Sequence, residues 1–185
     1  MKVLAISGSL RRDSHNTSLL HAAAELLPEG VELELWDGLK AVPPYDEDDD
    51  IVPAPAAVAD LRAAIAGADA ILFATPEYNH SIPGQLKNAL DWASRPLATN
   101  PLRNKPVAVV GASMGAFGAV WAQAELRKVL GATGARVVDA EVAVGHAHNR
   151  FDAHGRLTDE ELREQLAEVV QALVTVTEAR DLVAA

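Results

Sequence analysis

The sequence predicts an α/β fold, a three-layer αβα sandwich built around a parallel sheet. Apolar runs of strand length alternate along the chain with segments whose apolar residues recur at helical spacing. Most of these runs are continuously apolar, which is typical of strands covered by helices on both faces. No linker or internal repeat divides the 185 residues. We therefore expect residues 1–185 to form one domain, with five strands in the doubly wound order 2-1-3-4-5.

The predicted elements follow one another in the order βαβαβαβαβα. Strands are expected at residues 2–7, 31–36, 70–74, 106–110 and 136–144. Helices are expected at residues 17–27, 56–66, 86–94, 119–130 and 158–179. Glycines follow the second and fourth helices, and the run from Thr158 to Glu161 has the pattern of a capping box. The pattern thus predicts that Thr158 caps the last helix.

Composition excludes several classes of function. The net charge is −10, from 16 basic and 26 acidic residues, so a basic surface for nucleic acid is not expected. No window has the roughly 18 uninterrupted apolar residues of a membrane span. The apolar run at the start is too short for a secretory signal, and there are no cysteines for disulfides or thiolate chemistry. We expect a soluble, cytoplasmic protein.

Two polar loops mark the expected ligand site. Open α/β sheets bind ligands beyond the carboxyl ends of the strands, where the strand order reverses. In the order 2-1-3-4-5 that point lies between strands 1 and 3, which are followed by the loops at residues 8–16 and 75–85. Topology and composition therefore indicate the same edge of the sheet.

The first loop has the donors that a phosphate group needs. It combines hydroxyls, an amide and a guanidinium with the free N–H groups of a following helix, and the donors are Ser9, Arg11, Ser14, Asn16 and Thr17. The alternative is that Asn16 only caps the helix and that the arginines are solvated; Arg12 is given no role in either case. Neither GxxxxGK[ST] nor GxGxxG occurs here, so a single terminal phosphate fits better than a nucleoside triphosphate or a Rossmann-bound dinucleotide.

The second loop carries a family resemblance. It reads PEYN at residues 76–79 and SIPG at 81–84, and continues into LKN at 86–88 and DW at 91–92. Together these stretches resemble the signature of the NADPH-dependent FMN reductase family. The loop at residues 8–17, the glycine-rich loop at 111–118 and FDxxG at 151–155 are similar to further parts of that family, so the resemblance covers nearly the whole chain.

The resemblance implies a flavodoxin-like fold and an FMN-dependent NAD(P)H oxidoreductase. Hydride would pass from NADPH or NADH to FMN and then to a small acceptor, such as a quinone, an azo compound, free flavin or a metal oxyanion. The implied phosphate ligands of FMN are Ser9, Arg11, Ser14, Asn16 and Thr17. The implied neighbours of its ring are Pro76, Glu77, Tyr78, Asn79, Ser113 and Gly115. The resemblance implies no catalytic acid or base and no metal ligand.

It also implies a homodimer or homotetramer with the helix at residues 86–94 at the contact. In that helix we expect Trp92 to lie in the core or at the subunit interface. Gly115 and Gly118 would let the backbone approach the nicotinamide closely. The acidic run at residues 46–50 is either a solvated loop or a contact with a partner subunit's flavin.

Two other functions stay open. A flavodoxin-like electron carrier, which takes electrons only from a protein, would suit the acidic surface. A non-flavin protein could bind another phosphate ester in the first loop. A metal site at His146, His148 and His154 is a further, less favoured alternative, and His15 and His80 are expected at the rim of the flavin site.

Overall fold

A parallel sheet forms the centre of the computed structural model, which describes residues 1–184 and the side chains of residues 1–180. Its main strands are β1 (Lys2–Ser7), β2 (Glu32–Trp36), β3 (Ala70–Thr75) and β4 (Pro106–Ala112). The strand order is β2-β1-β3-β4-β5, and every pair is parallel. The predicted flavodoxin-like order 2-1-3-4-5 is confirmed.

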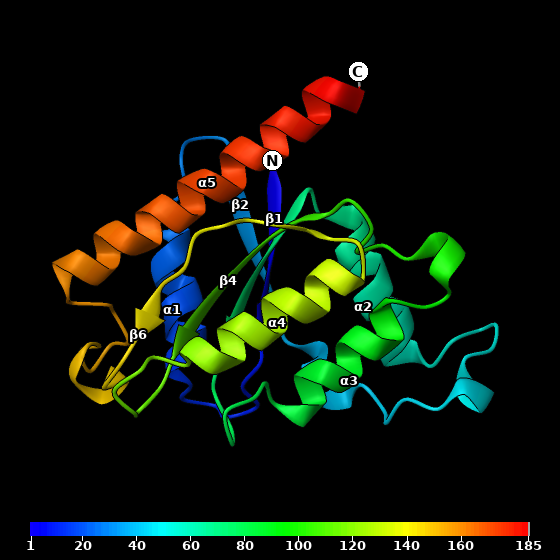
Figure 1. Cartoon of the computed structure of the whole chain (residues 1–185), viewed down its shortest axis with the longest axis horizontal. Helices are drawn as coiled ribbons and strands as arrows, with labels where there is room; N and C mark the ends of the chain where they lie inside the picture. The colour runs from blue at the N-terminus through cyan, green and yellow to red at the C-terminus, as the bar shows by residue number, and fades with distance from the viewer. Residues whose placement is uncertain (185) are drawn as a thin grey trace.

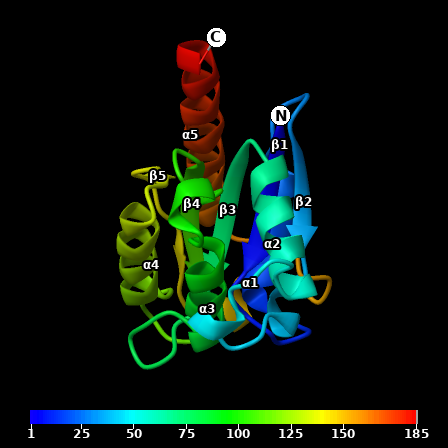
Figure 2. The ribbon, with the colours of Figure 1, turned by 90° about the vertical axis from the view of Figure 1, so that its right-hand side faces the viewer.

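Helices cover both faces of the sheet (Figures 1 and 2). The five helices of the described part are α1 (His15–Ala24), α2 (Ala56–Gly67), α3 (Gly84–Ala93), α4 (Val120–Ala132) and α5 (Glu160–Ala184). α1 and α5 pack on one face, and α2, α3 and α4 pack on the other. Among the described residues, no helix combines the length and the apolar character needed to cross a membrane.

Alternate side chains of the central strands belong to two separate hydrophobic cores, one on each face of the sheet. Leu4 and Ile6 pack with α2, α3 and α4, whereas Val3 and Ala5 pack with α1 and α5. Strands β3 and β4 are buried along their whole length. The continuous apolar runs in the sequence are therefore strands whose two faces are both covered.

The predicted last strand at residues 136–144 is wrong in detail, because it is interrupted. It consists of two short strands, β5 (Arg136–Val137) and β6 (Ala143–Val144), which pair with opposite ends of β4. Between them the guanidinium of Arg127 donates to the carbonyls of Val109, Val138 and Ala140. A side chain from α4 thus takes the place of the missing ladder bonds.

Two predicted helix starts also differ. α1 begins at His15, two residues before the expected start, because the Ser14 hydroxyl caps it and accepts from the Asn16 N–H. At α5 the Asp159 carboxylate accepts from Leu162 N, whereas the Thr158 hydroxyl donates to the carbonyl of Arg150. The predicted capping role of Thr158 is wrong, and Asp159 has that role.

The family signature on α3 holds the loop that follows β2. This loop contains two 3₁₀ turns, η1 (Gly38–Ala41) and η2 (Glu47–Asp49). Asn88 accepts from Tyr45 N and donates to Pro43 O, both at 2.7 Å, and Trp92 Nε1 donates to the same carbonyl at 2.9 Å. Trp92 is fully buried, so of its two predicted places, the core and the subunit interface, it lies in the core.

Candidate functional site

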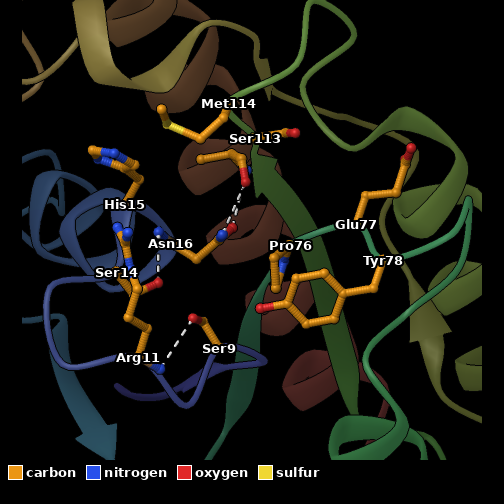
Figure 3. A pocket seen from close by; sticks show the side chains of 11 residues that line it. Ser9, Arg11, Ser14, His15, Asn16, Pro76, Glu77, Tyr78, Ser113 and Met114 are labelled. Atoms are coloured by element: carbon orange, nitrogen blue, oxygen red, sulfur yellow. Dashed lines mark hydrogen bonds between the residues drawn. The ribbon is translucent and has the colours of Figure 1, made fainter.

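A cavity of about 260 Å³ lies beyond the carboxyl ends of β1, β3 and β4. It brings together the loops after these three strands, as Figure 3 shows. Of the eleven predicted site residues, eight line it: Ser9, Arg11, Ser14, Asn16, Pro76, Glu77, Tyr78 and Ser113. Thr17, Asn79 and Gly115 do not line it, and His15, Ala112 and Met114 complete the lining.

One end of the cavity is the N-terminus of α1. Ser14, which caps this helix, is buried, and the Ser9 hydroxyl accepts from Arg11 N at 3.3 Å. The Arg11 guanidinium is exposed and donates to the carbonyl of Asp13. Free N–H groups, a positive helix end and a guanidinium meet at this end, which is the arrangement that binds phosphate groups.

Asn16 joins the first loop to the end of β4. Its Nδ2 donates to Ala112 O and its Oδ1 accepts from Ala112 N, both at 2.9 Å. The side chain is buried, and one N–H of the amide remains after these bonds. Asn16 therefore fixes the distance between two walls of the cavity and does not cap α1.

Thr17 lies below the loop rather than in the cavity. Its hydroxyl donates to the Ser7 hydroxyl at 3.1 Å. This contact ties the first turn of α1 to the end of β1. Thr17 thus supports the start of α1 from outside this cavity.

Residues 78–81 form a tight turn that presents Tyr78 to the cavity. Tyr78 and Ser81 exchange backbone hydrogen bonds at 3.0 and 3.1 Å, and Asn79 and His80 between them have φ of 54° and 60°. Two successive left-handed residues are the mark of a type I′ turn, in which asparagine is favoured. Asn79 therefore shapes the turn, while the half-exposed Tyr78 ring reaches across the cavity opening (Figure 3).

Glu77 connects this turn to α4. Its Oε2 accepts from the backbone N–H groups of Trp121 and Ala122 at 3.1 and 3.2 Å. No residue at the start of α4 caps the helix with its own side chain. The carboxylate thus caps α4 from a distant loop, and in Figure 3 it points away from Ser9 and Arg11.

The glycine-rich loop after β4 packs against the last strand. Ser113 N donates to Val144 O at 3.0 Å, and His146 N donates to Gly115 O at 2.9 Å. A Cβ at Gly118 would clash with the backbone of Ala143, and Gly118 has a φ of 57°. The close approach at Gly118 is therefore made to Ala143, and a role of this glycine toward nicotinamide stays a prediction.

Comparison with known proteins decides the family. The model of the family described as NADPH-dependent FMN reductase matches residues 1–149. This chain belongs to the NADPH-dependent FMN reductase family. The predicted enzyme class, an FMN-dependent NAD(P)H oxidoreductase, is confirmed.

Relatives of this FMN reductase agree in length and fold. An NAD(P)H-dependent FMN reductase of Pseudomonas aeruginosa is 47% identical over 174 residues, which are 94% of this chain and 93% of that protein. A 2-hydroxy-1,4-benzoquinone reductase of a Burkholderia species is 40% identical, over 90% of both chains. The structure of the flavoenzyme FerB, an NAD(P)H:(acceptor) oxidoreductase from Paracoccus denitrificans, matches with a TM-score of 0.86 and 37% identity, over 96% of this chain and 97% of FerB.

The cavity of this FMN reductase fits the cofactor of its family. Ser14 and Asn16 are polar residues buried directly beside the cavity, at the end where donors for a phosphate group gather. Pro76, Ala112 and the Tyr78 ring give the other part an apolar lining for a flat ring. The two ends of the cavity thus match the two chemical parts of FMN.

The sequence predicts His15 at the rim of the reductase site, and the structure makes it part of the wall. Its ring stacks on Phe151 with centroids 5.4 Å apart. Burial lowers the pKa of His15 from its ordinary value, and the nearby charges of Arg11 and His148 act in the same direction. The stretch from Phe151 to Gly155 was a signal for this contact, because it belongs to the family resemblance.

The other histidines do not gather around a metal site. The rings of His146 and His148 meet edge to face with centroids 6.3 Å apart. Within the described part of the chain, no group of three or more His, Cys, Asp or Glu residues is arranged to hold a metal ion.

Proposed function

We propose that this FMN reductase binds its cofactor in the cavity at the carboxyl ends of β1, β3 and β4. The phosphate lies at Ser9, Arg11, Ser14 and the N-terminus of α1, with Asn16 and Thr17 as its support. The ring lies along Pro76, Glu77 and Tyr78, with Asn79, Ser113 and Gly115 holding the surrounding loops. The observation that carries this proposal is the meeting of the α1 N-terminus with the PEYN turn in one cavity.

The reaction we propose is the reduction of a small acceptor by NAD(P)H in two half-reactions. Bound FMN supplies the capacity to take up a hydride from nicotinamide and to pass it to the acceptor. The protein side chains bind and orient, and none is needed as an acid or base. Backbone N–H groups of the PEYN turn border the ring edge, where hydrogen bonds tune the reactivity of a flavin.

The acceptor class follows from the exposed rim of the cavity. Tyr78 and Met114 lie at this rim and are 54% and 56% exposed. An aromatic ring and a flexible thioether that are already open to solvent suit a planar acceptor that stacks on the flavin. We therefore propose quinones as the main acceptors, with azo compounds, free flavin and metal oxyanions as further candidates.

We also propose that the site is completed in a homodimer or homotetramer of a cytoplasmic protein. The cavity of about 260 Å³ is smaller than the roughly 300–1,000 Å³ typical of small-molecule sites, so part of a bound flavin would protrude. Phe117 and Trp121 stand nearby with 65% and 43% of their surface exposed. Exposed apolar groups of this size are typical of interaction surfaces. A monomer in sedimentation analysis at micromolar concentration would contradict this part of the proposal.

The experiment for the proposed function is anaerobic reduction. The purified protein, loaded with FMN, is mixed with NADPH or NADH while the oxidised flavin band is followed. We expect rapid bleaching and its reversal when a quinone is added. Bleaching that is slow with both nucleotides but fast with a partner reductase would favour the electron carrier. Failure to retain FMN would favour the non-flavin phosphate-ester protein.

A further inference from the structure

A second cavity lies next to the FMN cavity, on the other side of His15. We call it the histidine pocket, and it measures about 600 Å³. It is formed by the first loop, one flank of α1 and the segment before α5, and its lining residues with polar or aromatic side chains include Arg12, Asp13, His21, His148, Phe151 and His154. Ser14 and His15 line both cavities. The two cavities therefore adjoin at these residues.

The wall between the cavities is aromatic. His15 and Phe151 stack with their rings inclined by only 21°, and Phe151 is half-buried. The lowered pKa of His15 favours its uncharged ring at neutral pH. An uncharged stacked pair of this kind presents a flat edge against which a heteroaromatic base can pack.

The histidine pocket offers hydrogen-bond donors to an anionic group on a ligand. Arg12 is exposed and forms no ion pair with any residue that the structure describes. Asp152 is already neutralised by Arg156, whose Nε lies 2.8 Å from its Oδ2, which leaves Asp13 as the unpaired acid of the lining. The imidazoles of His21, His148 and His154 add N–H donors. In a protein of net charge −10, such a local set of donors is required to hold an anion.

We propose that the histidine pocket binds the adenosine half of NADPH, with the 2′-phosphate at Arg12 and the adenine near Phe151. The inference rests on the proposed function, because it requires the nicotinamide half to lie at the FMN cavity. The two cavities adjoin at Ser14 and His15, so a nucleotide whose nicotinamide lies over the flavin can extend its adenosine half into the histidine pocket. A guanidinium is the usual partner of the 2′-phosphate that distinguishes NADPH from NADH. Arg12, which the sequence left without a role, thereby becomes the residue that selects the donor.

The test compares Arg12→Ala with Arg136→Ala, an exposed arginine outside both cavities. Reduction of the bound flavin is followed in a stopped-flow instrument over a range of NADPH or NADH concentrations. For Arg12→Ala we expect the half-saturating NADPH concentration to rise about tenfold or more, because a charge-assisted hydrogen bond is lost. For Arg12→Ala, the half-saturating NADH concentration and the limiting rates should stay within about twofold of those of the unmodified protein. Arg136→Ala should leave the half-saturating concentrations of both nucleotides unchanged.

Two further experiments test whether the adenine lies at Phe151 and whether the pocket recognises the 2′-phosphate of NADPH rather than any phosphate. Phe151→Leu keeps an apolar side chain but removes the ring, so the half-saturating concentrations of both nucleotides should rise. We expect 2′,5′-ADP to compete with NADPH more strongly than 5′-AMP or inorganic phosphate does. Equal effects of Arg12→Ala on NADPH and NADH, or no competition by 2′,5′-ADP, would overturn the inference. Either result leaves the proposed function intact, whereas a protein that neither nucleotide reduces would contradict the proposed function itself.

Discussion

The amide of Asn16 and the backbone of Ala112 form a two-point pair between the first loop and the end of β4. Both hydrogen bonds measure 2.9 Å, and both groups are buried. The pair sets the separation of two cavity walls that are 96 residues apart in sequence. A hydrogen-bonded amide in this place orders the cavity before any ligand arrives.

Asn16→Ala should therefore cost both stability and cofactor affinity. Ala112 would keep a buried N–H and a buried C=O without partners, which costs about 2–4 kcal/mol in free energy of unfolding. Urea denaturation of the apoprotein measures this loss. Asn104→Gly is the control, because Asn104 has a φ of 59° that glycine adopts readily. A loss below about 0.5 kcal/mol for Asn16→Ala would contradict the structural role of the pair.

Two substitutions of Glu77 should distinguish the contribution of its hydrogen bonds to α4 from the contribution of its negative charge. Glu77→Ala removes the acceptor for Trp121 N and Ala122 N and should destabilise the protein by about 1–2 kcal/mol. Glu77→Gln keeps an acceptor oxygen but loses the charge at the helix N-terminus, so about half of that loss is expected. Thermal and urea unfolding of the two variants check this order. Equal losses would mean that the contact acts only through charge.

Asn88→Ala should loosen the loop at residues 43–50. The side chain accepts from Tyr45 N, so its removal exposes that amide to solvent exchange. Hydrogen exchange at Tyr45 should speed up about five- to tenfold, as expected for the loss of one hydrogen bond. Lys87→Ala on the same helix is the control, because Lys87 pairs with Asp91 at the surface. An unchanged exchange rate at Tyr45 in Asn88→Ala would show that the loop is held by other contacts.

His15 should make the stability of the protein depend on pH near neutrality. Its pKa is lowered in the folded state, first by burial and then by Arg11 and His148, so the unfolded chain binds its proton more readily. The full stability is present above the ordinary value of 6.5 and is lost as the pH falls through 6.5 toward the lowered folded value. The pH dependence of unfolding by urea between about pH 8 and pH 5 should be steeper for the unmodified protein than for His15→Gln. Identical slopes would contradict the lowered pKa.

The arrangement of the sheet was readable from the sequence because its causes are local. Runs such as residues 70–74 are apolar throughout, and such a run is stable only where both faces of the strand are covered. The position of the site followed from the topology, since the loops after strands 1 and 3 meet at one edge. The family signature then identified the chemistry.

The details that sequence reasoning missed depend on contacts between distant residues. The interrupted last strand results from Arg127, which reaches from α4 to three carbonyls. Thr158 does not cap α5 because its hydroxyl donates to the carbonyl of Arg150 instead. Asn79 and Thr17 are residue types that often bind ligands. In the structure, Asn79 shapes a turn through its positive φ, and the Thr17 hydroxyl bonds to Ser7. No local pattern contains this information.

The central claim, that the first loop holds the phosphate of FMN, is tested most directly by titrating the apoprotein with FMN and with riboflavin, which lacks the phosphate. We expect FMN to bind at least about a hundredfold more tightly, because the phosphate accepts several charge-assisted hydrogen bonds at Arg11 and the α1 N-terminus. In Arg11→Ala most of this preference should disappear, while riboflavin binding stays nearly unchanged. Equal affinities of the unmodified protein for FMN and riboflavin would contradict the assignment of this loop as the phosphate site, and a preference undiminished in Arg11→Ala would contradict the part assigned to Arg11.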